Sequence, residues 1–138
     1  MKKILVALIA SLALFLAACG GSSPESIAED YIKALFKFDY GKMKKLATEK
    51  NKAGLEKSEQ EMEKSMQELK DKDKKQMEEK KELYAAMTVT GSEEAKISED
   101  GNSATVKVTA VDKDKKTSDF KVHLIKEKDA WKVDQLGK

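Results

Sequence analysis

Cysteine, proline, histidine and arginine are scarce in this sequence of 138 residues. It has one Cys, one Pro, one His and no Arg, and only 6% of its residues are aromatic. A single cysteine excludes an intramolecular disulfide. One histidine, with no cysteine beyond Cys19, argues against a zinc site or a cysteine nucleophile. We therefore expect no metal, no cofactor and no enzymatic activity.

The lack of arginine also bears on the choice of partner. All 27 basic residues are Lys, against 25 acidic residues, and two of the lysines precede residue 19. The remaining 120 residues therefore carry 25 lysines and 25 acids, with no net formal charge. Nucleic-acid binding draws its affinity from an excess of basic side chains. A nucleic-acid partner is not expected.

Long hydrophobic runs are limited to the N-terminus. Lys2 and Lys3 precede an apolar run, 4–18, that only Ser11 interrupts. Fifteen residues in a helix extend about 22 Å, which is short of the ~30 Å hydrocarbon core of a bilayer. A positive start followed by a short apolar run is typical of a secretory signal, so we expect export.

The residues after this run resemble the lipobox of bacterial lipoproteins. The matching residues are Leu16, Ala17, Ala18 and Cys19, and the segment Gly20-Gly21-Ser22-Ser23 resembles the flexible tether that follows a lipobox. The resemblance implies cleavage between Ala18 and Cys19 and a lipid on the Cys19 sulfur. Two or three acyl chains on one residue hold a protein stably at a membrane. The alternative is a cysteine that follows an ordinary signal by chance.

These features predict the organisation of the chain. We expect a signal peptide over 1–18, a lipidated tether over 19–23 and one domain over 24–138. The protein would be exported and anchored to the cell membrane. In a source with two membranes, Gly20 rather than Asp at the second mature position favours the outer membrane, on its periplasmic or surface face.

The first part of the domain reads as two helices. Ser23 as N-cap and Pro24 at the first position begin a helix, and Asp39 is placed to cap a second, shorter one. The apolar side chains recur at helical spacing, which predicts one buried face. They are Ile27, Tyr31, Ile32, Leu35 and Phe38, followed by Met43, Leu46 and Ala47.

Residues 52–85 form a charged segment of a different kind. Charged residues make up 19 of these 34 positions, and strong helix formers dominate. We expect helix, with a possible bend at 70–75. Apolar residues recur every seven positions and predict a narrow seam that packs on the domain or on a partner helix. The seam comprises Leu55, Met62, Leu69 and Leu83, with the polar Gln76 at the position between the last two and Met66 beside it.

The last third of the chain alternates between apolar and polar residues. This period predicts antiparallel strands near 87–90, 95–98, 104–110, 120–125 and 131–133. Trp131 and Val133 should face the core. His123 should lie on the opposite, polar face, because its neighbours Val122 and Leu124 face inward. The fold class is therefore α+β, with N-terminal helices on a curved antiparallel sheet of about four strands and a long charged helical insertion.

Three stretches resemble small uncharacterised bacterial lipoproteins with a cystatin-like or nuclear-transport-factor-2-like domain. They are residues 23–32 with 38–41, residues 102–108, and the final Trp131-Lys132-Val133. The resemblance implies a helix in the hollow of a curved sheet, and the segment 52–85 departs from it as an enlarged insertion. That fold hosts enzymes, binders and inhibitors, so it does not define function.

The favoured function is a non-enzymatic binding or accessory module of the cell envelope. Its partners would be the membrane, through Cys19, and an envelope protein or a second copy, through 52–85. Met62, Met66 and Leu69 are the candidate binding residues. One alternative is an enzyme or small-ligand carrier that uses the hollow between helix and sheet, although a small ligand is not expected. Another is an inhibitor of a secreted hydrolase.

Overall fold

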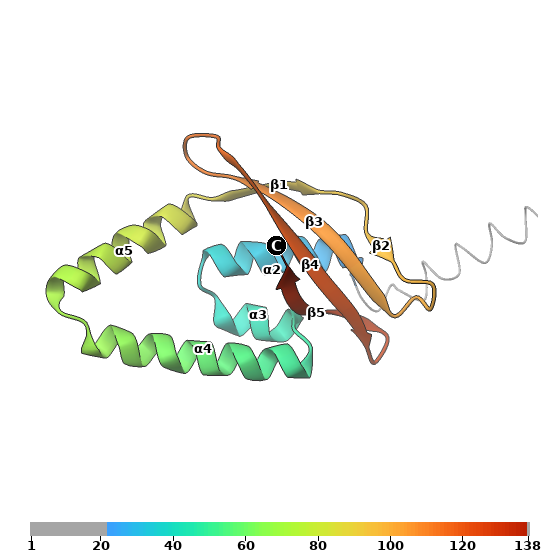
Figure 1. The fold of residues 1–138 in the computed structure, drawn as a ribbon, viewed down its shortest axis with the longest axis horizontal. Helices are drawn as coiled ribbons and strands as arrows, with labels where there is room; N and C mark the ends of the chain where they lie inside the picture. Colours follow the sequence, from blue (N-terminus) through green and yellow to red (C-terminus); the bar gives the residue numbers. More distant parts are fainter. Residues whose placement is uncertain (1–21, 138) are drawn as a thin grey trace, which may run out of the picture.

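The computed structural model describes residues 22–137 and confirms the α+β class (Figure 1). The sheet is open and antiparallel, in the order β1-β3-β4-β5, with β2 pairing with β3. The elements are α2 (Pro24–Phe36), α3 (Tyr40–Leu46), α4 (Glu49–Glu68), α5 (Asp71–Ala85), β1 (Thr88–Ser92), β2 (Lys96–Ile97), β3 (Ser103–Val111), β4 (Thr117–Glu127) and β5 (Ala130–Gly137).

The alternating strands place one apolar face of the sheet in the core. Val106 and Val108 on β3, Val122 on β4 and Val133 on β5 are fully buried, while their polar neighbours face the other side. Trp131 is 8% exposed and belongs to this core. The predicted phase of β3, β4 and β5 is therefore confirmed.

Helix α2 covers the apolar face of the sheet (Figure 1). The Ser23 hydroxyl accepts a hydrogen bond from the Ser26 amide at 3.2 Å, and Pro24 occupies the first turn, so both features predicted for this helix start are confirmed. Ala28 and Ile32 lie fully buried between helix and sheet. The concave face of the sheet is thus filled by α2.

The end of α2 differs from the prediction at Phe38. We expected Phe38 on the helix, but α2 ends at Phe36 and Phe38 has a left-handed backbone, with φ of 54°. The Phe38 amide donates to the Leu35 carbonyl and the Asp39 amide to the Ala34 carbonyl, at 3.1 and 2.9 Å. This pair of bonds ends a helix with a left-handed residue, a position that usually holds glycine. The Asp39 side chain then caps α3, as predicted, by accepting from the Lys42 amide at 3.0 Å.

The charged segment forms two helices that project from the body as an arm, which we define as residues 56–85 (Figure 1). The chain breaks between α4 and α5 at Leu69 and Lys70, where Leu69 has extended backbone angles. The predicted bend therefore lies at the beginning of the range 70–75, and residues 71–85 are helical. Among residues 22–137, no helix is both long and apolar enough to cross a membrane.

Candidate functional site

A pocket of about 350 Å³ lies where the second half of β5 meets α2, α3 and α4. Apolar side chains and a smaller number of polar groups surround it, as in many ligand sites. The residues that line it include Tyr31, Phe38, Tyr40, Asn51, Leu55 and Asp134. The pocket therefore lies beside α2 and not in the hollow of the sheet, which α2 occupies.

Thr48 joins the start of α4 to strand β5. Its amide donates to the Val133 carbonyl at 2.9 Å, and its hydroxyl donates to the Asp134 carboxylate at 3.1 Å. The same hydroxyl oxygen accepts from the Asn51 amide at 3.1 Å and so caps α4. Thr48 is only 2% exposed. These bonds close the free edge of β5 at Val133 and fix where α4 leaves the body.

Asn51 extends this connection to α2. Its side-chain nitrogen donates to the Val133 carbonyl at 3.0 Å and to the Tyr31 hydroxyl at 3.2 Å. Burial raises the pKa of Tyr31, because it disfavours the phenolate, and the hydrogen bond from Asn51 opposes part of that rise. Tyr31 is therefore a neutral hydrogen-bond partner that ties α2 to α4.

A second tyrosine of the pocket faces the charged part of α4. The pKa of Tyr40 is raised by burial and by the negative charge of Glu59. Glu59 in turn pairs with Lys44 at 2.6 Å, and this hydrogen bond raises the pKa of Lys44. The pair links α3 to α4 one turn beyond Leu55, which is buried in the core.

Replacing Tyr31 with Phe tests this hydrogen-bonded junction. We expect Tyr31→Phe to lower the free energy of unfolding at pH 7 by about 1 kcal/mol, because Asn51 loses an acceptor. Above pH 10 an unfolded tyrosine ionises while the folded Tyr31, with its raised pKa, stays neutral, so the wild type loses stability as pH rises. The Phe variant lacks this loss.

The difference between the two proteins should therefore shrink between pH 7 and pH 10.5. Urea unfolding at both values measures it, and the lysines common to both proteins cancel in the comparison. A difference that grows with pH would show that Tyr31 is more readily ionised in the folded state.

Three polar side chains of the pocket, those of Tyr31, Asn51 and Asp134, already have hydrogen-bond partners. The Asp134 carboxylate accepts from Thr48, and Tyr31 accepts from Asn51. No histidine lines the pocket; His123 lies on the outer face of the sheet, with Nδ1 3.1 Å from the Thr105 hydroxyl. Within residues 22–137, no group of three or more His, Cys, Asp or Glu residues is arranged to hold a metal. The arrangement positions α4 and leaves room for a small apolar occupant.

The residues of the predicted seam separate into two groups. Leu55 is 8% exposed and belongs to the core, whereas Met62, Met66 and Leu69 are half-buried and lie outside the core cluster. The predicted seam is therefore not one continuous stripe. Leu83, its last member, lies on α5 beyond the break and is 54% exposed.

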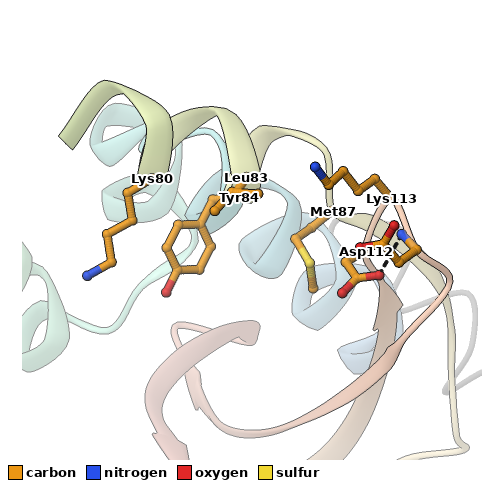
Figure 2. Close-up of a pocket in the computed structure, with 7 residues that line it drawn as sticks. Lys80, Leu83, Tyr84, Met87, Asp112 and Lys113 are labelled. Atoms are coloured by element: carbon orange, nitrogen blue, oxygen red, sulfur yellow. Dashed lines mark hydrogen bonds between the residues drawn. The ribbon is translucent and has the colours of Figure 1, made fainter. Parts of the chain in front are cut away.

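Helix α5 contacts the body near its C-terminal end and has no buried residue. The Tyr84 ring meets the Phe38 ring edge-on, with centroids 5.7 Å apart, so the left-handed Phe38 supports the arm. Figure 2 shows Leu83, Tyr84 and Met87 beside a smaller pocket, of about 280 Å³, next to Asp112 in the β3–β4 turn. This second pocket is an exposed apolar area with a charged rim.

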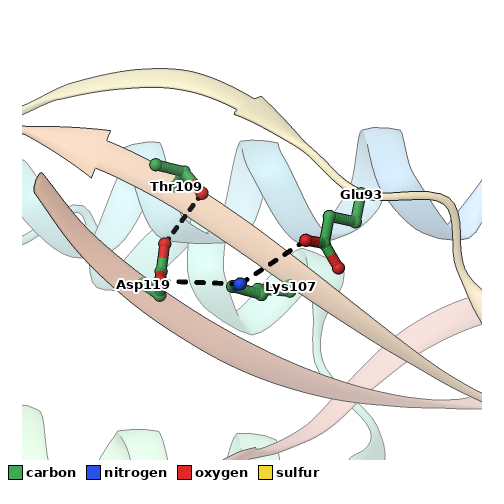
Figure 3. A network of polar contacts seen from close by, with 4 residues as sticks. All are labelled: Glu93, Lys107, Thr109 and Asp119. Carbon is green, nitrogen blue, oxygen red and sulfur yellow. Dashed lines mark hydrogen bonds and ion pairs between the residues drawn. The ribbon is translucent and has the colours of Figure 1, made fainter.

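The outer face of the sheet carries a polar network instead (Figure 3). The Lys107 ammonium lies 3.4 Å from Glu93 and 3.7 Å from Asp119, and these carboxylates raise its pKa. The Thr109 hydroxyl donates to Asp119 at 2.8 Å. The pairs join β3, β4 and Glu93, the residue that follows β1, on an exposed surface, where such contacts contribute little to stability.

Comparison with known proteins places the chain in a family. Residues 17–134 match the domain of unknown function DUF4878, and the chain belongs to that family. No curated protein and no solved structure matches. Cys19 and the other lipobox residues lie outside the part of the chain that the structure describes, so the predicted anchor stays a prediction.

Sequence reasoning missed Thr48, Asn51 and Tyr84. A threonine directly before a run of strong helix formers, as at Thr48, is a recognisable N-cap. Its bonds to Val133 and Asp134, more than 80 positions away, leave no local signal. The contact of Tyr84 with Phe38 depends on the break at Leu69, which sequence placed only to within a few residues.

Proposed function

We propose that this protein is an exported lipoprotein, anchored to a membrane through Cys19, that binds another envelope component with its arm and catalyses no reaction. The observation that carries the proposal is the position of Met62, Met66 and Leu69. Met62 and Met66 lie on α4 beyond Leu55, Leu69 follows the last residue of that helix, and all three lie outside the core cluster. An ordered helix whose apolar side chains miss the core is suited to packing against a partner.

The composition of the arm supports this function. Ordering a residue costs about 1 to 2 kcal/mol of backbone entropy, and helix α5 buries no side chain to offset that cost. Methionine is flexible and polarisable, so its side chain adapts to a partner surface. The partner is a second protein or a second copy of this chain.

The lipid anchor is supported by the lipobox-like residues Leu16, Ala17, Ala18 and Cys19. The helix-on-sheet arrangement agrees with the cystatin-like or nuclear-transport-factor-2-like fold that the sequence resembles. The fold leaves the function open.

A small-ligand carrier is the second candidate, because a pocket remains beside α2. Its volume of about 350 Å³ is within the usual range for ligand sites. Its polar groups come from Tyr31, Asn51 and Asp134. Those groups already form hydrogen bonds within the protein, so we favour partner binding by the arm over ligand carriage. We find no exposed loop wedge among the described residues that would favour a hydrolase inhibitor.

A double substitution on the arm tests the favoured function. We expect Met62→Lys with Leu69→Lys to change the melting temperature by no more than a few degrees and to abolish association, because the two side chains lie outside the core. A photo-crosslinking residue at position 66 reports association in intact cells. Analytical ultracentrifugation of the purified protein reports self-association.

Two control variants sharpen the result. Gln60→Lys with Ser65→Lys adds two lysines and the same charge at exposed positions of α4 and should leave crosslinking unchanged. Leu55→Ala removes a core side chain from the same helix and should lower the free energy of unfolding by about 2 to 5 kcal/mol. A Met62/Leu69 variant that keeps both its stability and its crosslinks would show that the arm is a solvated spacer.

A further inference from the structure

A groove of about 590 Å³ lies between the end of α3, the start of α4 and the turn from β4 to β5. Its walls hold more lysines than acids, although residues 19–138 as a whole carry equal numbers of the two. The lysines that line it are Lys44, Lys45, Lys52, Lys128 and Lys132.

The two carboxylates in the groove are Glu49 and Glu127, and one of them is already engaged. The Glu127 oxygens accept from the Glu49 amide at 3.3 and 3.4 Å, at the start of α4. No carboxylate among residues 22–137 lies within 4.0 Å of the ammonium groups of Lys45, Lys52 and Lys128. These three ammonium groups are available to an anion.

Two further lysines of the groove have protein partners. Lys44 pairs with Glu59 at 2.6 Å, and the Lys132 ammonium donates to the Lys45 carbonyl at 2.8 Å. The second bond holds strand β5 against the end of α3 and so fixes one wall of the groove. Lys45 and Lys52 therefore project from α3 and α4, and Lys128 projects from the β4–β5 turn.

The position of the groove relates it to the start of the domain. Along the longest axis of the molecule, the beginning of α2, the beginning of α4 and the β4–β5 turn lie toward one end, and the α4–α5 junction lies at the other (Figure 1). Cys19 is five positions before Pro24, and five extended residues span at most about 18 Å. A lipid on Cys19 would hold this end of the domain close to the bilayer.

We infer that the groove binds the phosphate groups of anionic lipids at the membrane surface and sets the orientation of the anchored domain. The inference rests on the lipid anchor of the proposed function. A lysine near an anionic surface contributes about fivefold to membrane binding, and the effect falls off within a Debye length. With the groove on the bilayer, the arm points away from the membrane, where Met62 and Leu69 can reach a partner.

The test uses the full-length protein, expressed with its own signal and purified from membranes, in lipid nanodiscs. One set of discs contains phosphatidylcholine alone, and the other contains 30% phosphatidylglycerol. Acetylation rates of individual lysines are measured by mass spectrometry. We expect Lys45, Lys52 and Lys128 to react at least threefold more slowly in the anionic discs, while Lys72 and Lys74 on the arm react equally in both.

Added salt and free phosphate distinguish the source of the anion. Protection should disappear in 1 M NaCl, where the Debye length is about 3 Å. Inorganic phosphate at 10 mM with neutral discs should give no protection. Equal protection there would assign the groove to a soluble anion and overturn the membrane orientation.

A variant tests the orientation itself. A dye on Lys72→Cys should show weak energy transfer to a dye in an anionic bilayer, because the arm stands away from it. Replacing Lys45, Lys52 and Lys128 with Gln should at least double the transfer, whereas the same change at Lys70, Lys74 and Lys75 should not. Equal transfer in both variants would overturn the inference while Cys19 remains lipidated. An unmodified Cys19 in the intact-mass spectrum would instead contradict the proposed function.

Discussion

Replacing Trp131 with Ala is expected to lower the free energy of unfolding by about 3 to 5 kcal/mol. Trp131 lies on β5 with 8% of its surface exposed, in the core that α2 and the sheet share. The cavity left by the indole would be bounded by strands and helix, which cannot close it fully. The Lys126 ammonium also lies 5.1 Å from the ring centroid and would lose this contact.

Urea unfolding followed by far-ultraviolet circular dichroism measures the loss, because the variant has no tryptophan to report it. Trp131→Phe is the matched control and should cost less, since it keeps an aromatic ring in the site. The wild-type protein should fluoresce at a shorter wavelength than free tryptophan. A cost below 1 kcal/mol for Trp131→Ala would place the side chain outside the core.

The strands could be predicted from sequence because their burial is periodic. On β3, Ala104, Val106, Val108 and Ala110 alternate with polar residues, and all four are buried. Each residue of such a strand has its face fixed by its position alone. The weaker strands were less well bounded: β1 extends to Ser92, and β2 has only two residues.

The starts of α2 and α3 could also be predicted from sequence, but the end of α2 could not. Ser23 and Asp39 are short polar residues placed where a cap is needed, and both bond as expected. Phe38 has apolar character and helical spacing, so sequence placed it on α2. Its left-handed backbone is stabilised by the two bonds that end the helix and by the contact with Tyr84.

The pocket could be predicted only in part, because it depends on contacts between distant segments. The sequence placed the alternative ligand site in the hollow between helix and sheet, whereas the observed pocket lies beside α2. The bonds from Thr48 and Asn51 to Val133 decide that position, since they set α4 against β5. The composition of 52–85 predicted helix, because helix propensity is a local property.

Replacing Cys19 with Ser is expected to abolish membrane anchoring, the largest functional effect that we predict. A serine hydroxyl cannot form the thioether that the proposed lipid requires, and the chain has no other cysteine to take its place. The unprocessed precursor or a soluble species should accumulate. Palmitate labelling of cells, followed by fractionation, measures both outcomes.

Ser22→Ala changes a hydroxyl in the adjoining tether and should leave label and location unchanged, so a defect confined to Cys19→Ser reports the anchor. Full palmitate labelling of the Cys19→Ser protein would refute the lipoprotein assignment, and with it the membrane-facing role of the lysine groove.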